Sequence, residues 1–258
     1  MKNNPRFPYS LSVFFPAYND APSLPKLIGT TFATLEAHVA DFEVIVVNDG
    51  SADNTEEVLR ELKQQHGPRL KVVTHRINRG YGGALRSGFA SATKEFVFYT
   101  DGDGQYDVSE LPELLAQAGP DVGLVNGFKM KRHDPWHRIV IGALYNQFAR
   151  RLFRVRLRDI DCDYRLIRNA TLKSIQLTCT SGTICVELVK KIEATGTRVV
   201  EVPVSHLARE HGRSQFFRIK SLATTFVQLL DLHRKLVLGP WLEVWRQRIT
   251  RQPVEGNS

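Results

Sequence analysis

Cysteine is scarce in this chain, and long hydrophobic runs are missing. The three cysteines, Cys162, Cys179 and Cys185, are an odd number without metal-ligand spacing. They indicate neither a disulfide framework nor a zinc site, and they favour a reducing compartment. No window holds about 18 uncharged apolar residues, and residues 1–10 lack the apolar core of a signal peptide. The sequence therefore predicts a cytoplasmic protein that neither carries a secretion signal nor spans a membrane.

Acidic residues are outnumbered in one long stretch. Between Lys129 and Arg168 there are eleven Lys and Arg residues against four Asp, within a chain of net charge +8. Such a segment attracts phosphate groups, whether on a ligand, a lipid surface or a nucleic acid. With 258 residues, 42% of them apolar, the chain is long enough for one sizeable domain with its own core.

Strand and helix patterns alternate through the first half, which is typical of a parallel sheet covered by helices. We expect strands at 9–15, 42–47, 70–74 and 95–100, and helices at 24–39, 54–65 and 83–92. Further along we expect helices at 137–153, 171–177, 184–194 and 217–238, and strands at 164–167 and 198–204. The predicted fold class is α/β, without a visible domain boundary or repeat.

Polar clusters follow three of the predicted strands, at 16–20, 48–51 and 101–105. In an open parallel sheet, ligands bind beyond the carboxyl ends of the strands. These clusters are therefore expected to converge on one edge.

Asp101-Gly102-Asp103 places two carboxylates directly after a predicted strand. Hard cations such as Mg²⁺ or Mn²⁺ take oxygen ligands, and one or two carboxylates plus substrate phosphates is a common arrangement. Since Asp-x-Asp is frequent by chance, a solvated loop is the alternative interpretation.

Asp49 ends another buried strand and can reach a ligand at the same edge, although a turn with a helix cap from Ser51 or Asp53 would explain the segment equally. The glycines of residues 79–83 open a helix and allow backbone N–H groups to approach a phosphate or ribose. A tight connection is the alternative there.

Taken in order, these motifs resemble the signatures of family 2 glycosyltransferases with the GT-A fold. The motifs are Pro16-Ala-Tyr-Asn-Asp20, Val47-Asn-Asp-Gly-Ser51, Asn78 to Gly88 and Thr100-Asp-Gly-Asp-Gly-Gln105. The branch that the chain resembles most contains dolichol-phosphate mannosyltransferases and bacterial polyprenyl-phosphate glycosyltransferases. Residues 163–166 and 209–216 are similar, more loosely, to two C-terminal elements of the family.

The resemblance implies a role for each matching residue. The implied donor-binding residues are Pro16, Ala17, Tyr18, Asp20, Asp49, Gly80, Asp101, Gly102, Arg209 and Ser214. Asp101, Asp103 and Gln105 would surround the metal and diphosphate, and Lys129, Arg138 and Arg213 would bind the acceptor. Asp20 stands where Glu is more usual and Asn48 where a second Asp is common, so the donor base and sugar stay open.

The implied activity is inverting, metal-dependent transfer of a hexose from a UDP- or GDP-sugar to a polyprenyl or dolichyl phosphate. A phosphate monoester, with a second pKa of about 6, is already a nucleophile at neutral pH. A hydroxyl acceptor would instead need a carboxylate base, for which Asp161 and Asp163 are the candidates. Charge compensation for nearby arginines is their alternative role, and Asp103 and Arg165 complete the predicted catalytic set.

The remaining expectations concern an alternative function, partners and domain limits. A non-catalytic nucleotide-sugar-binding module is an alternative function, whereas nucleic acid is excluded as a partner because the acidic edge would repel it. Residues 217–248 form an amphipathic stretch that either lies on a membrane surface or packs on the core. We expect a catalytic domain at 1–216, with a nucleotide-sugar half at 8–126 and an acceptor half at 127–216, and a helical extension at 217–258. The oligomeric state is not indicated.

Overall fold

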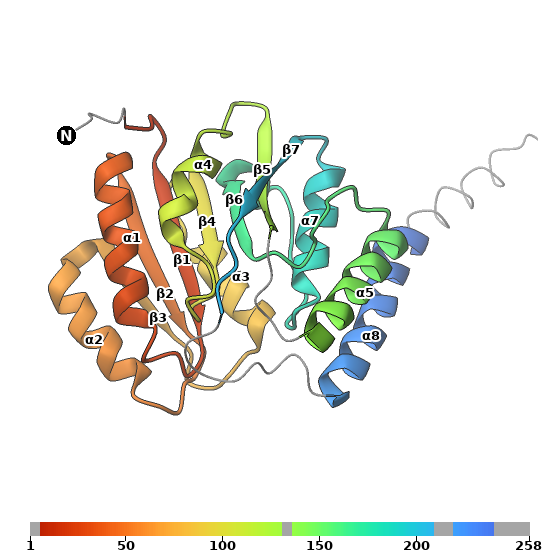
Figure 1. Cartoon of the computed structure of the whole chain (residues 1–258), viewed down its shortest axis with the longest axis horizontal. Helices are drawn as coiled ribbons and strands as arrows, with labels where there is room; N and C mark the ends of the chain where they lie inside the picture. Colours follow the sequence, from red (N-terminus) through yellow and green to blue (C-terminus); the bar gives the residue numbers. More distant parts are fainter. Residues whose placement is uncertain (1–5, 131–135, 209–218, 240–258) are drawn as a thin grey trace, which may run out of the picture.

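The computed structural model describes residues 6–130, 136–208 and 219–239. These residues form a seven-stranded sheet with helices on both faces, in the order β3-β2-β1-β4-β6-β5-β7 (Figure 1). The strands are β1 Leu11–Ala17, β2 Phe42–Asn48, β3 Leu70–Thr74, β4 Phe96–Thr100, β5 Val122–Lys129, β6 Tyr164–Arg168 and β7 Arg198–Val204. The predicted α/β fold with a mostly parallel sheet is confirmed.

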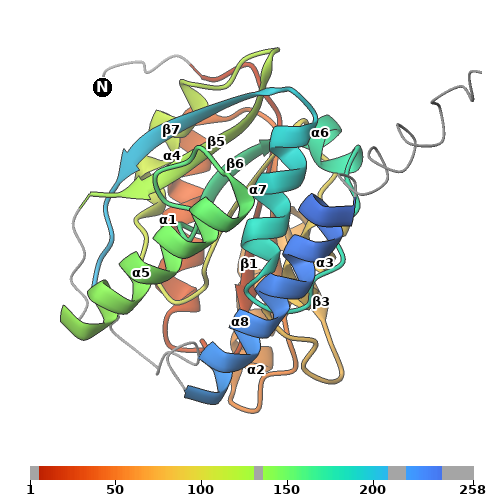
Figure 2. The same ribbon diagram turned by 90° about the vertical axis from the view of Figure 1, so that its right-hand side faces the viewer.

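Helices cover the sheet in two groups. The α-helices are α1 Leu24–His38, α2 Thr55–His66, α3 Tyr81–Ser91, α4 Leu111–Leu115, α5 Trp136–Phe153, α6 Asn169–Lys173, α7 Ile184–Ala194 and α8 Ile219–His233. Short 3₁₀ turns lie at Gly67–Arg69 and Val108–Glu110, and a π-helical turn at Arg234–Leu238 follows α8. Helices α1, α2 and α4 pack on one face, and α3, α5, α7 and α8 on the other (Figure 2).

The strand β1 shows why the central strands are almost wholly apolar. Val13 and Phe15 face the core under α1, whereas Phe14 faces the core under α3. Because successive side chains of a strand point to opposite faces, a strand covered on both sides is apolar at nearly every position. Because β1 pairs in parallel with both β2 and β4, the carboxyl ends of these three strands lie together at one edge of the sheet, the lower edge in Figure 1.

The strand β6 runs antiparallel to both of its neighbours, β4 and β5. Tyr164, its first residue, lies opposite Thr100, the last residue of β4. The segment that precedes β6 is therefore brought to the edge where β4 ends. This reversal places residues from the second half of the chain beside the Asp101-Gly-Asp103 motif.

The strand β5 and the helix α4 were not predicted from the sequence. The strand β5 contains Gly123, Asn126 and Gly127, which interrupt its apolar pattern. These glycines meet packing needs, because a β-carbon at Gly123 would lie 2.1 Å from Thr197 Oγ1, and one at Gly127 would lie 3.0 Å from the carbonyl oxygen of Tyr164. Close packing between strands therefore hid the strand from a pattern based on hydrophobicity.

The helix α8 covers much of the expected amphipathic stretch. Leu229 and Leu232 pack into the core with α5 and α7. Among the described residues, no helix is both long and apolar enough to cross a bilayer.

Candidate active site

The loops that follow β1, β2 and β4 meet at the carboxyl edge of the sheet. The backbone N–H of Asp49 donates to the carbonyl of Ala17 at 2.9 Å, and that of Asn19 donates to Ser51 Oγ at 3.0 Å. Ser23 Oγ donates to the carbonyl of Gly102 at 2.7 Å. The loops that contain the three polar clusters are therefore hydrogen-bonded to one another at one edge, as the strand pattern predicted.

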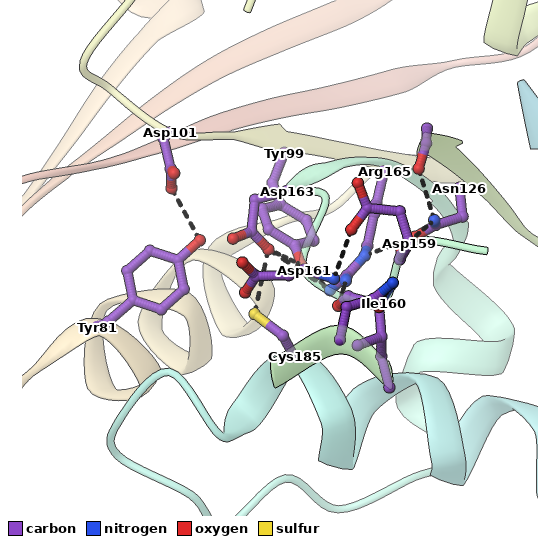
Figure 3. A network of polar contacts seen from close by, with 12 residues as sticks. Tyr81, Tyr99, Asp101, Asn126, Asp159, Ile160, Asp161, Asp163, Arg165 and Cys185 are labelled. Atoms are coloured by element: carbon purple, nitrogen blue, oxygen red, sulfur yellow. Dashed lines mark hydrogen bonds and ion pairs between the residues drawn. The ribbon is translucent and has the colours of Figure 1, made fainter. Parts of the chain in front are cut away.

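The Asp101-Gly102-Asp103 segment lies tightly against the end of β1. A β-carbon at Gly102 would lie 2.7 Å from the carbonyl oxygen of Pro16 and 3.6 Å from Asp20 Oδ2, so no side chain fits there. Tyr81 Oη donates to Asp101 Oδ1 at 2.8 Å, on the left of Figure 3. Asp103 is 8% exposed, and its Oδ1 accepts the backbone N–H of Gln105 at 3.0 Å. Both carboxylates are thus held by hydrogen bonds.

The oxygen-bearing side chains at this position are ligands that suit a hard divalent cation. They are the Asp101 and Asp103 carboxylates and the Gln105 amide, whose Nε2 donates to the carbonyl of Leu207 at 3.3 Å. Throughout the described residues, no group of three or more His, Cys, Asp or Glu side chains is arranged to hold a metal. A cation here would therefore need oxygens from a bound phosphate, as Mg²⁺ commonly does.

The loop at residues 178–180 packs against the glycine-rich segment, a contact that was not predicted from the sequence. Gly80 has φ of +79°, and a β-carbon there would lie 2.6 Å from the carbonyl oxygen of Thr180. That same carbonyl accepts the backbone N–H of Gly82 at 2.9 Å. Only glycine fits both the conformation and the space at Gly80.

The buried Glu187 of α7 holds this loop by hydrogen bonds. Its carboxylate accepts the backbone N–H groups of Thr178 at 3.0 Å and Cys179 at 2.8 Å. Burial alone would raise the pKa of Glu187, but hydrogen bonds from Lys191, Cys179 and Thr178 outweigh burial and keep that pKa below its ordinary value. The ionised carboxylate therefore fixes the loop against the start of α3.

Arg165 lies at the centre of a buried polar network (Figure 3). Its side chain is 0% exposed. The guanidinium donates to Tyr99 Oη at 2.6 Å, Asn126 Oδ1 at 2.7 Å and the carbonyl of Ile160 at 2.6 Å. This arrangement connects β4, β5 and the segment before β6, and it favours a positioning role for Arg165 over direct contact with substrate.

Three polar groups contact one carboxylate oxygen of Asp163. Its Oδ1 accepts from Tyr99 Oη at 3.2 Å and from Cys185 Sγ at 3.1 Å, and it lies 3.5 Å from Arg165 Nη1. Burial, followed by the nearby Asp163 carboxylate, raises the pKa of Cys185 well above its ordinary value, so the thiol stays protonated and donates. One oxygen of this carboxylate is already engaged by a cation and by two hydrogen-bond donors. The environment of Asp163 thus favours charge compensation.

Comparison with known proteins identifies the family. The family model described as glycosyl transferase family 2 matches residues 12–175, which is more than half of the chain. The chain belongs to glycosyl transferase family 2. The predicted resemblance is thereby confirmed, and the site described above occupies the position in which that family's motifs were recognised.

One curated relative of this family 2 chain is undecaprenyl-phosphate 4-deoxy-4-formamido-L-arabinose transferase from Edwardsiella ictaluri. It is 32% identical over 212 residues, which are 81% of this chain and 64% of the relative. The chain therefore spans about two thirds of the length of that relative.

Solved structures of similar fold include glucosyl-3-phosphoglycerate synthase from Mycobacterium tuberculosis. The complex with Mn²⁺, UDP and glucosyl-3-phosphoglycerate aligns with a TM-score of 0.67 and 18% identity, over 88% of this chain and 80% of that one. The complex with Mg²⁺ and UDP gives 0.65 and 17%, over 88% and 79%. At this identity, the likeness shows the fold alone.

The other predicted site residues of this family 2 chain lie in different environments. Pro16 and Ala17 end β1, and Tyr18 follows them with 41% of its surface exposed. Its N–H donates to Asp20 Oδ2 at 2.9 Å. The side chain of Lys129 is 8% exposed, and its Nζ donates to the carbonyl of Asp161 at 2.7 Å. The Lys129 amine therefore holds the segment before β6, and its predicted contact with an acceptor phosphate stays a prediction.

Some predictions lie outside the described residues. These are Arg209, Arg213 and Ser214, and the side chain of Arg138. Conversely, the site contains residues for which the sequence indicated no role, namely Tyr81, Tyr99, Asn126 and Glu187. Tyr81 lay within a recognised motif, so its place at the start of the glycine-led helix was an available signal.

Proposed function

We propose that this chain transfers a hexose, with inversion, from a UDP- or GDP-sugar to a polyprenyl phosphate. The observation that carries the proposal is the meeting of the Asp101-Gly-Asp103 segment, the glycine-led start of α3 and the segment before β6 at one sheet edge. The 32% identical relative is an undecaprenyl-phosphate transferase, which supports the acceptor class.

Asp101, Asp103 and Gln105 would hold the divalent cation in this proposal. When bound, Mg²⁺ or Mn²⁺ would neutralise charge on the departing nucleoside diphosphate. Structures of similar fold were crystallised with Mn²⁺ or Mg²⁺ and UDP, which supports this choice. Tyr81 would keep Asp101 oriented through its 2.8 Å hydrogen bond.

The acceptor phosphate needs no strong base in this proposal. A phosphate monoester with a second pKa of about 6 is largely dianionic at neutral pH and attacks the anomeric carbon directly. The contacts of Asp163 agree with this, because its Oδ1 is already engaged by Tyr99, Cys185 and Arg165. Basic residues between Lys129 and Arg168 would attract the phosphate.

The first test measures donor binding and transfer together. With Mn²⁺ or Mg²⁺, a UDP- or GDP-sugar is expected to raise the unfolding temperature of the full chain, and EDTA is expected to cancel the rise, because a ligand that binds only the folded state stabilises it. Radiolabelled sugar should then pass to undecaprenyl phosphate. Donor binding with transfer only to a saccharide would contradict the acceptor, and binding without turnover would favour a non-catalytic module.

The proposal extends to peripheral membrane contact at the inner face, because the proposed acceptor is itself a membrane lipid. Helices α5 and α8 lie side by side at the end of the molecule far from α2 (Figure 1). They share a groove of about 280 Å³ lined by Ile141, Leu144, Tyr145, Phe148, Thr225, Phe226 and Leu229. Around it, Val140, Leu144, Phe226 and Leu230 are between 45% and 62% exposed. We call these four residues the apolar face.

Membrane contact is tested by flotation with vesicles that contain anionic lipid. The wild-type chain should float, and the double variant Leu144→Glu/Phe226→Glu should stay at the bottom, since carboxylates on the apolar face oppose insertion among acyl chains. The control Gln64→Glu/Gln65→Glu adds equal charge to the exposed side of α2 and should float like wild type. Equal flotation of the apolar-face variant would contradict the contact.

The catalytic domain at 1–216, with halves at 8–126 and 127–216, and the extension at 217–258 remain part of this proposal. Their boundary falls among residues that the structure does not describe.

A further inference from the structure

Three side chains are linked by consecutive hydrogen bonds near the carboxyl edge of the sheet. Asp49 Oδ1 lies 2.5 Å from His75 Nδ1, and His75 Nε2 lies 2.8 Å from Ser87 Oγ. The side chains of Asp49 and His75 are only 4% and 3% exposed. The three residues come from the end of β2, the end of β3 and the middle of α3, so the contacts join separate segments.

Strand pairing explains why His75 stands beside Asp49. In the parallel register of β2 and β3, Asn48 pairs with Thr74. The next residue of each strand is therefore also adjacent, and the backbone N–H of His75 donates to the carbonyl of Asn48 at 2.9 Å. The backbone holds the imidazole in place before its side-chain contacts are considered.

The carboxylate of Asp49 is held through one oxygen. Its Oδ1 takes both the His75 contact and the backbone N–H of Arg79 at 2.8 Å. Among the described residues, no hydrogen bond to Oδ2 is found. A buried carboxylate is costly unless its oxygens are paired, so this geometry anchors Oδ1 and reserves Oδ2 as an acceptor.

The geometry points to His75, supported by Ser87, as a positioning residue that aims Asp49 Oδ2 at the nucleobase of the donor. This inference rests on the proposed function, because it assumes that a nucleotide binds at this edge. A hydroxyl both donates and accepts, so Ser87 satisfies Nε2 in either protonation state of the ring while Nδ1 donates to Asp49. The Asp49 contact is thereby fixed.

A carboxylate aimed in this way selects among bases by hydrogen-bond chemistry. An ionised carboxylate only accepts. Uracil presents N3–H and guanine presents N1–H at the pairing edge, whereas cytosine N3 and adenine N1 are acceptors that would face the carboxylate with lone pairs. A site built to hydrogen-bond a donor group strongly rejects analogues that lack it. Uridine and guanosine nucleotides are therefore the expected class.

The test measures calorimetric dissociation constants of UDP, GDP, CDP and ADP, each with Mn²⁺, on the full chain. Wild type should bind UDP or GDP about 10-fold or more tightly than CDP and ADP. His75→Leu should weaken the preferred nucleotide about 10-fold and reduce its preference over CDP. His75→Asn, which keeps an N–H near the Nδ1 position, should recover most of the affinity.

Two serine variants of α3 separate positioning from general stability. Ser87→Ala should weaken the preferred nucleotide by about 3-fold and lower the unfolding temperature only modestly, since it leaves His75 Nε2 without its hydroxyl partner. Ser91→Ala, which removes a hydroxyl bonded to the Ser87 carbonyl in the same helix, should bind like wild type. This pair keeps the inference testable even if His75→Leu fails to fold.

Each outcome bears on the inference. Unchanged affinity and unchanged base preference in both His75→Leu and Ser87→Ala would overturn the positioning role while leaving the proposed function intact. Equal wild-type affinity for UDP, GDP, CDP and ADP would also overturn it. A wild-type chain that binds no nucleotide with Mn²⁺ would overturn the proposed function and this inference together.

Discussion

Asp103→Ala is expected to lower sugar transfer by about 1000-fold, because the variant loses a carboxylate that would hold the cation, and the cation would neutralise charge on the leaving diphosphate. Asp103 is nearly buried at the end of β4, and its Oδ1 already accepts the N–H of Gln105. The measurement is the initial rate of transfer at saturating donor, together with Mn²⁺-dependent UDP binding by calorimetry. Both should fall.

The matched control for this variant is Asp121→Ala. Asp121 precedes β5 at the opposite edge of the sheet, and its side chain is 65% exposed in an ion pair with Arg198. Removal of an exposed pair of this kind changes stability by less than about 1 kcal/mol, and transfer should stay at the wild-type rate. If Asp103→Ala keeps transfer within 10-fold of wild type, the predicted metal role of Asp103 is wrong.

Arg165→Ala is expected to lower the free energy of unfolding by about 3 to 5 kcal/mol, because it removes the fully buried partner of a largely buried ion pair. Loss of the guanidinium leaves the Asp163 carboxylate without its ion-pair partner, and Tyr99 and Asn126 without the hydrogen-bond donor that they share. Urea denaturation at neutral pH measures the effect. Arg198→Ala, which breaks the exposed pair with Asp121, should cost less than about 1 kcal/mol.

A second variant separates stability from catalysis at this position. In Arg165→Met/Asp163→Asn the unpaired charge is removed, and part of the lost stability should return, because apolar replacement of a buried ion pair is often close to neutral. Recovery of transfer along with stability would show that Arg165 acts by positioning. Full stability with transfer still abolished would instead support the predicted catalytic role.

The donor side of the site was largely predictable because its residues follow apolar strands. Asp49 and Asp101 each come directly after a run that is buried on both faces, and parallel strands bring such positions to one edge. The acceptor side was less predictable. Whether Asp163 serves as a base or as a charge partner depends on Tyr99 and Cys185, which lie 64 and 22 residues away in the sequence.

By itself, the sequence determined the alternation of strands and helices, the buried central strands and the family, because these depend on local hydrophobic periodicity and short motifs. Only the tertiary structure decided that β6 runs antiparallel, that Thr180 closes the glycine-rich segment and that His75 holds Asp49. These features depend on which distant segments pair and in which direction. Such choices come from the packing of the whole domain, which no local pattern encodes.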